Sequence, residues 1–246
     1  KSALSFFKKI IKQDPKNIDA LYNQGIALNQ LRKYQDAITC FDKVLEINPK
    51  HIAAINNRGI ALAELGNTDD ALEYYNKAIE IDPKYAAAHY NKGVLYDKLL
   101  QHEEAIRNLD EAIKCDSGNV NTAFYRGVVL GKMKKHEEAL NCFENIYRKH
   151  PKHMDAFFHK GMELAELGKH ERALEIFDKL FQMHEGNVNV IYAMARSNAA
   201  MNNVGRALYL LEQAVKKDRK TIKKWALEDE FFDSLQDEPK FARLIK

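Results

Sequence analysis

A glycine-rich stretch is the first place in this sequence where residue types and spacing suggest chemistry. Residues 127–133 read Gly-Val-Val-Leu-Gly-Lys-Met, similar to a loop that holds nucleotide phosphates. Such a loop needs four residues between its glycines and a Ser or Thr after the Lys to hold magnesium. Here only three residues intervene, and Met133 follows Lys132. The stretch also lies within a predicted helix, so the sequence disfavours nucleotide binding.

Three histidines spaced 34 residues apart, His102, His136 and His170, raise the question of a metal site. Zinc-bound nitrogens each lie about 2.0–2.1 Å from one ion, whereas packed helices lie about 8–10 Å apart. Tyr34 occupies the same place in the first 34-residue period. The spacing therefore favours a packing role, and we assign no metal and no cofactor.

Three cysteines, Cys40, Cys115 and Cys142, are an odd number without a short Cys-x-x-Cys pairing. This pattern fits reduced thiols better than a disulfide framework, and it favours a cytoplasmic location. Neither these cysteines nor any serine stands in a recognisable nucleophile context. We therefore expect that the chain is not an enzyme.

The composition narrows the class of partner. The chain has 246 residues and a net charge of only +3, well below the clustered positive charge that phosphate backbones attract. No apolar run approaches the roughly 20 residues that cross a bilayer, and the N-terminus lacks a signal-peptide segment. We expect neither nucleic acid nor a membrane as the partner.

The elements that must position any site repeat with a period of 34 residues. Glycine, alanine, a large apolar residue and proline each recur in one column. The glycines are Gly25, Gly59, Gly93, Gly127 and Gly161; the alanines run from Ala3 to Ala207; the large apolar residues are Phe7, Phe41, Tyr75, Leu109, Phe143, Phe177 and Leu211; the prolines are Pro15, Pro49, Pro83 and Pro151.

Each period contains two stretches with helical spacing of apolar residues. Between Ile52 and Tyr85, for example, Ile55 and Leu62 lie on the first stretch, and Ala71 and Tyr75 on the second. The small residues fall where the two helices must cross closely. Since a single hairpin cannot bury its apolar face, successive hairpins are expected to stack.

These columns resemble the tetratricopeptide repeat (TPR) pattern. The resemblance implies an all-α fold, a right-handed superhelix (α-solenoid) of helix-turn-helix repeats, with residues 1–246 forming a single solenoid. Residues 1–17 align as the second helix of a truncated repeat, so we expect a fragment, and residues 222–246 should form capping helices. The six full repeats are 18–51, 52–85, 86–119, 120–153, 154–187 and 188–221.

Glycines also mark the predicted turns and joints between helices. Gly66 and Gly168 should take the left-handed conformation that ends a helix. At two joints proline is absent and Gly118 or Gly186 stands one place later, so we expect a glycine cap there. A last short helix should begin near Pro239 and cover the final repeat.

In TPR proteins one stripe of the first helices lines a concave groove. Here that stripe carries Asn23, Asn57 and Asn91 in series. Asparagine is unfavourable inside a helix, and its amide offers a donor and an acceptor to a peptide bond. The column resembles the asparagine ladders of TPR peptide carriers, although a plain solvated polar face would show the same residues.

Aromatic residues accompany this ladder. The other candidate peptide-binding residues are Tyr22, Asn56, Tyr90, Phe124, Tyr125, Phe158 and His159. Some of these side chains could instead pack sideways between neighbouring helices. Arg58, Lys92, Arg126 and Lys160 either attract acidic ligand groups or extend along an edge between repeats, and the second role is favoured.

We therefore expect a non-catalytic protein–protein interaction module that binds another protein or an extended peptide segment in its groove. Two alternatives stay open. The N-terminal half repeat leaves Leu4, Phe7 and Ile11 in need of a cover, which would suit a self-associating scaffold and a homo-oligomer. The array could also be the substrate-recruiting arm of a longer enzyme chain.

Overall fold

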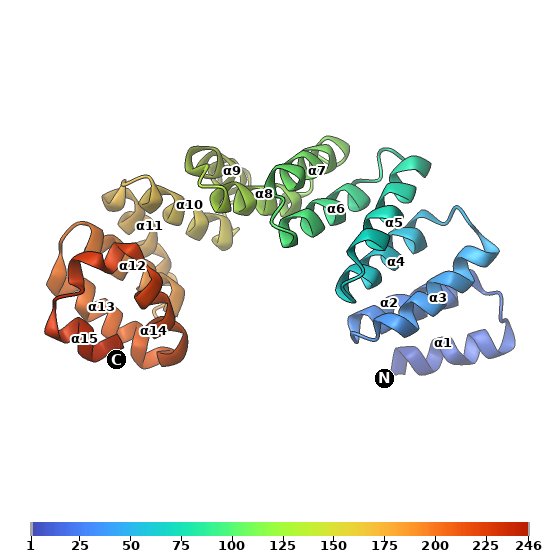
Figure 1. Ribbon diagram of the computed structural model, residues 1–246, viewed down its shortest axis with the longest axis horizontal. Coiled ribbons are helices and arrows are strands. Elements are labelled where there is room, and N and C mark those ends of the chain that lie inside the picture. Colours follow the sequence, from blue (N-terminus) through green and yellow to red (C-terminus); the bar gives the residue numbers. More distant parts are fainter. Residues whose placement is uncertain (1, 246) are drawn as a thin grey trace. The chain divides into compact units, whose positions relative to one another are not determined.

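The computed structural model describes residues 2–245, and all of their regular secondary structure is helical. Consecutive helices pack as antiparallel hairpins, which confirms the predicted all-α class of helix-turn-helix repeats (Figure 1). The chain divides into two compact units, one up to Ala123 and one from Phe124 onward. In the described part of the chain, no helix is both long and apolar enough to traverse a bilayer.

The first unit contains a single helix followed by three hairpins. Its helices are α1 (Ser2–Gln13), α2 (Ile18–Gln30), α3 (Tyr34–Ile47), α4 (Ile52–Glu64), α5 (Thr68–Ile81), α6 (Ala86–Lys98) and α7 (His102–Cys115). Helix α1 packs on α2, and its Leu4 and Ile11 join the core that contains Leu21 and Phe41. Phe6 of the same helix stays 60% exposed.

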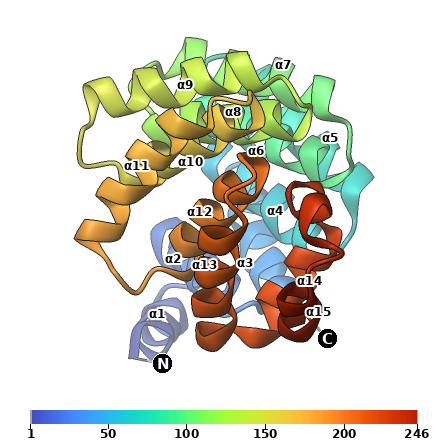
Figure 2. The same cartoon turned by 90° about the vertical axis from the view of Figure 1, so that its left-hand side faces the viewer.

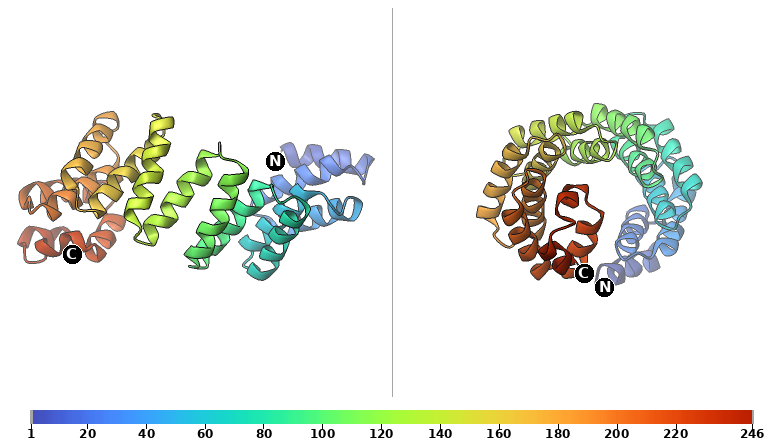
Figure 3. Two further views of the ribbon diagram at one scale, coloured as in Figure 1. Left: turned by 90° about the horizontal axis from the view of Figure 1, so that it is seen from above. Right: turned by 60° about the vertical axis from the view of Figure 1, so that its left-hand side comes forward.

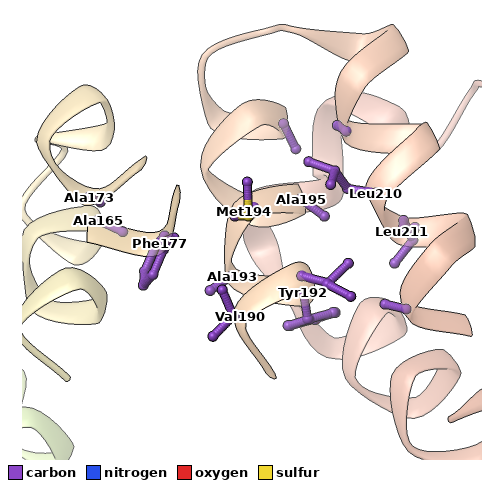
Figure 4. Close-up of a cluster of buried hydrophobic side chains, with 14 of the residues drawn as sticks. Ala165, Ala173, Phe177, Val190, Tyr192, Ala193, Met194, Ala195, Leu210 and Leu211 are labelled. Atoms are coloured by element: carbon purple, nitrogen blue, oxygen red, sulfur yellow. The ribbon is translucent and has the colours of Figure 1, made fainter. Parts of the chain in front are cut away.

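The division between the units falls in α8 (Val120–Lys132). The helices that follow it are α9 (His136–Lys149), α10 (Met154–Glu166), α11 (His170–Met183), α12 (Val188–Ala200), α13 (Val204–Lys217), α14 (Arg219–Glu228), the 3-10 helix η1 (Glu230–Leu235) and α15 (Pro239–Ile245). The core around α12 and α13 joins Tyr192 and Met194 to Leu210 and Leu211 (Figure 4).

The glycine column lies where the two helices of a hairpin cross. A Cβ atom built on Gly59 would lie 2.7 Å from the ring of Tyr75, and one on Gly161 would lie 2.6 Å from the ring of Phe177. The other three glycines of the column meet the corresponding large residue in the same way, at 2.5–2.9 Å. The predicted close crossing is confirmed, because any side chain at these positions would separate the helices.

The turns within the hairpins share one backbone shape. Gly66 and Gly168 are left-handed, as predicted, with φ of 87° and 71°. The equivalent residues of the other four repeats are left-handed without being glycine, namely Arg32, Leu100, Lys134 and Asn202. In every repeat the next residue donates its N–H to a carbonyl five residues earlier, at 2.8–3.0 Å. This closure defines a Schellman motif, so hairpin geometry imposes the conformation on whatever residue is present.

The predicted glycine caps at Gly118 and Gly186 are wrong. Among the described glycines only Gly66 and Gly168 have positive φ. At the Gly118 joint, the carboxylate of Asp116 accepts the Gly118 N–H at 3.2 Å. Three of the four joints that contain proline use the same turn, since Asp14, Asn48 and Asp82 accept the N–H two residues on at 2.9–3.1 Å. A polar side chain before the proline column therefore shapes these joints.

The C-terminal segment covers the last hairpin, as predicted. Helix α15 begins at Pro239 and contacts α13 and α14 (Figure 2). Phe232, Leu235 and Phe241 are fully buried there. Unexpectedly, η1 also contacts α12, the first helix of the sixth repeat. In Figure 3 the red C-terminal segment lies beside the orange-brown helices that precede it.

The glycine column generates a stability prediction. Gly59→Ala should lower the free energy of unfolding by about 1–3 kcal/mol, because the new methyl group overpacks the Tyr75 ring. Gly205→Ala is the matched control, since no atom lies within 4 Å of a Cβ built on this helical glycine. The control should equal the parent or exceed it slightly. Equal urea midpoints for the two variants would contradict the close crossing.

Candidate protein-binding surface

The first helices of neighbouring repeats touch one another directly in the first unit, α2 with α4 and α4 with α6. These three helices carry the predicted asparagine ladder, one residue on each. The amide nitrogen of Asn57 donates to the hydroxyl of Tyr22 at 3.1 Å and to the carbonyl of Ala53 at 2.8 Å. The amide nitrogen of Asn91 donates to Oδ1 of Asn56 at 2.9 Å.

Both bonds between repeats join positions 35 residues apart. Asn57 and Asn91 are thus each held by the residue preceding the ladder position of the repeat before it. Asn56 is only 3% exposed, so within the predicted site it serves to orient Asn91. Asn23 belongs to the first full repeat and is exposed, and it donates instead to the carbonyl of Asp19 in its own helix at 2.8 Å.

The amide orientation follows from these partners. A backbone carbonyl only accepts hydrogen bonds, so the amide nitrogens of Asn23 and Asn57 must face the carbonyls of Asp19 and Ala53. Within residues 2–245, the Oδ1 atoms of the three ladder asparagines accept no hydrogen bond. The ladder therefore presents acceptors, and much of its donor capacity is used inside the protein.

The two tyrosines of this face are half-buried and neutral at pH 7. Burial raises the pKa of the Tyr22 hydroxyl, and the hydrogen bond from Asn57 opposes this rise. Burial likewise raises the pKa of Tyr90. The ring of Tyr22 lies 5.1 Å from that of His51, whose Nδ1 caps α4 by accepting the N–H of Ala54.

The basic residues next to the ladder bridge successive repeats. Arg58 pairs with Asp42 at 2.5 Å, and Lys160 pairs with Glu144 at 3.1 Å. Lys92 donates to the side-chain oxygen of Asn76 at 2.8 Å. For these three cations the inter-repeat role is confirmed, because each partner lies on the second helix of the preceding repeat.

In the second unit the corresponding face is aromatic. The ring of His159 lies 5.1 Å from Phe143, 5.2 Å from Phe124 and 5.8 Å from Phe158. Burial lowers the pKa of His159, with Asp155 opposing, so the imidazole is neutral at pH 7. Phe124, Tyr125, Phe158 and His159 are all half-buried. The structure therefore gathers three of these four predicted residues into one apolar cluster.

The sixth repeat differs, because the C-terminal segment lies on its first helix. The Tyr192 hydroxyl donates to Asp229 at 2.8 Å, and the Arg196 guanidinium pairs with the same carboxylate at 2.6 Å. Tyr192 stands 34 residues after Phe158 and so shares the column of that candidate residue. The cover of this position by the C-terminal segment was not predicted from the sequence. The acidic and aromatic run Asp229–Phe232 was the available signal.

Two of the three histidines in the column, His102 and His136, contact carboxylates. Nδ1 of His102 lies 3.0 Å from Asp97, and Nδ1 of His136 lies 2.8 Å from Glu163. Burial raises the pKa of Glu163, and His136 opposes this rise. Among the described residues no group of three potential ligands could hold a metal ion.

The glycine-rich stretch has a packing role in the structure. A Cβ on Gly131 would lie 2.7 Å from Oε1 of Glu163. The second glycine of residues 127–133 thus makes room for a buried carboxylate. Cys40 is also a packing residue, since it is buried and burial raises the pKa of its thiol.

The bond between Tyr22 and Asn57 can be tested by a double-mutant cycle. Tyr22→Phe and Asn57→Ala should each lower the free energy of unfolding by about 0.5–1.5 kcal/mol. The double variant should lose less than the sum, because both substitutions remove the same bond. Asn23→Ala is the control and should change stability by less than about 0.5 kcal/mol. Additive losses in urea denaturation would argue against the bond.

Comparison with known proteins agrees with the repeat architecture. Models of the tetratricopeptide repeat match residues 17–84, 52–117, 126–187 and 164–228. A search of curated proteins gave no match.

Several solved structures share the fold. YrrB, described as "a TPR protein with an unusual peptide-binding site", is 25% identical, with 77% of this chain and 98% of that chain covered and a TM-score of 0.63. A tetratricopeptide repeat protein from Parabacteroides merdae is 22% identical, with 91% of this chain and 89% of that chain covered and a TM-score of 0.64. PilF from Pseudomonas aeruginosa is 21% identical, with 86% of this chain and 97% of that chain covered and a TM-score of 0.70. With the hairpins, their glycine crossings and the family matches in agreement, the chain belongs to the tetratricopeptide repeat family.

Proposed function

We propose that this TPR protein is a non-catalytic module that binds an extended peptide segment of a partner protein on its first-helix faces. The observation that carries this proposal is the set of Oδ1 acceptors on Asn23, Asn57 and Asn91, which accept no hydrogen bond within residues 2–245. A row of acceptors suits main-chain N–H groups, which every residue except proline supplies. Three cysteines, an odd number without a short Cys-x-x-Cys pairing, favour a reducing compartment, and we propose a cytoplasmic location.

The spacing of the ladder suggests the conformation of the bound segment. Packed helices lie about 8–10 Å apart, and a polyproline II helix advances about 9.3 Å in one turn of three residues. In that conformation every third N–H points to the same side. A segment lying across α2, α4 and α6 would therefore offer one N–H to each asparagine, whatever its sequence.

In the second unit, the aromatic residues of the first-helix face would select apolar side chains of a bound segment. The cluster of Phe124, Phe158 and His159 is half-buried and neutral, so it suits apolar ligand side chains. The similarity to YrrB, whose description includes a peptide-binding site, is consistent with this mode of binding.

The ladder predicts a loss of affinity without unfolding. Asn23→Ala should weaken binding of a partner peptide by about two- to ten-fold, because one hydrogen bond of roughly 0.5–1.5 kcal/mol is lost. The triple variant with Asn57→Ala and Asn91→Ala should bind about ten- to two-thousand-fold more weakly if the losses add. Isothermal titration calorimetry measures the peptide affinity of both variants.

Asn23→Ala is the cleaner of the two variants, since its amide makes no bond to another repeat. Its melting temperature should equal that of the parent, while the triple variant should melt somewhat lower. Unchanged peptide affinity in the triple variant would show that the ladder is only a solvated polar face.

Self-association is a second candidate function, favoured by the exposed ring of Phe6 on α1. Sedimentation at high concentration should then detect a dimer that Phe6→Glu removes, because a buried charge opposes apolar pairing. Gln13→Glu adds the same charge at another exposed position of α1 and should leave the dimer intact. A parent protein that is monomeric at every concentration would exclude this candidate.

A further inference from the structure

The first-helix face of the sixth repeat already holds a short piece of polypeptide, residues 229–231 of the same chain. The Asp229 carboxylate accepts a hydrogen bond from Tyr192 at 2.8 Å and pairs with Arg196 at 2.6 Å. Two residues later, the ring of Phe231 lies 4.4 Å from the guanidinium carbon of Arg196 and 5.6 Å from the ring of His170. Asp229 and Phe231 are therefore bound by chemistry that would serve equally for a separate peptide.

The covering segment has two different sides. Phe232 and Leu235 are fully buried. The Phe232 ring lies 5.8 Å from that of Phe241 in α15 and 5.7 Å from that of Tyr192 in α12. The Asp229 side chain is 12% exposed and Phe231 is partly exposed, and both touch the first-helix face. The core residues hold η1 in place. Asp229 also caps η1 by accepting the Phe231 N–H at 3.2 Å, and with Phe231 it occupies this face.

The first-helix face can lose its occupant without leaving a buried charge unpaired. Arg196 pairs with Glu166 at 2.9 Å as well as with Asp229, so its guanidinium keeps one carboxylate when Asp229 departs. A cavity of about 390 Å³ also adjoins these residues and is lined by Trp225, Glu228 and Glu230. Exchange therefore avoids the large penalty of an isolated buried ion.

We propose that Tyr192, Arg196 and His170 form a subsite for partner peptides that carry a carboxylate and, two residues later, an aromatic ring. Asp229 and Phe231 fill this subsite as an internal ligand until such a partner replaces them. The proposal rests on the peptide-binding function above, and it adds an acidic and aromatic specificity to it.

The single tryptophan of the chain makes this subsite directly observable. The ring of Trp225 lies 5.4 Å from that of Tyr192 and lines the adjoining cavity. The probe is a blocked peptide with the sequence of residues 228–232, Glu-Asp-Glu-Phe-Phe. It is titrated into the full chain carrying Asp229→Ser and Phe231→Ser, and Trp225 fluorescence is recorded.

The double variant should bind the probe saturably, and at least about ten-fold more tightly than the wild type, whose subsite is filled. Replacing the probe's Asp by Asn, or its first Phe by Ala, should weaken binding at least about ten-fold. Adding Arg196→Gln to the double variant should also weaken binding of the original probe at least about ten-fold. Asp233→Ser, an exposed change in the same 3-10 helix, is the matched control and should behave as wild type.

Absence of saturable binding, or equal affinity for the three probes, would overturn the proposal. Melting curves of the double variant check that it keeps its fold, including the cap that contains Phe232. Should the double variant not fold, Asp229→Asn alone takes its place, with the same expected order of affinities. The variant Asn23→Ala should leave the affinity for this probe unchanged, so failure of the subsite and failure of the asparagine ladder are distinguishable.

Discussion

The contact between a glycine of one helix and a large ring of the next is the constraint on which this structure depends. Rings such as those of Tyr75 and Phe177 occupy the space where a Cβ of Gly59 or Gly161 would stand, less than 3 Å away. The two helices can therefore approach closely enough to form a hairpin with one buried seam. Each hairpin then offers its remaining apolar surface to the next, so stability is spread over neighbouring contacts.

This close packing also determines what the first-helix faces present. Because the first helices of adjacent repeats touch, a side chain on one reaches the next, and Tyr22 accepts a hydrogen bond from Asn57. The same bond that joins the two repeats uses the nitrogen of the Asn57 amide and leaves its oxygen as an acceptor. The proposed binding role would thus share one amide group with a structural role.

The C-terminal cap illustrates how one segment can serve two surfaces. Phe232 and Phe241 close the core, because the sixth repeat is followed by this segment and not by another hairpin of the same kind. Asp229 and Phe231 occupy the first-helix face with an ion pair, a hydrogen bond and a cation–π contact. The cap lies on α12. The aromatic cluster around His159, which contains most of the binding residues predicted in the second unit, lies on other helices.

The sequence by itself determined the repeat, the hairpins, the close crossing at Gly59 and the start of the last helix at Pro239, since all of these follow from local periodicity and small residues in register. It also located the ladder, because helical spacing places Asn23, Asn57 and Asn91 on one stripe. Only the tertiary structure decided which amide atoms are used, because Asn57 meets Tyr22 35 residues away. The tertiary structure also decided the left-handed turn at Leu100, because hairpin closure imposes that conformation against side-chain preference. It decided the docking of Asp229 on Tyr192 and Arg196 as well. These features depend on how particular side chains and backbone segments meet in space, which the repeat period does not specify, so only the folded chain decides them.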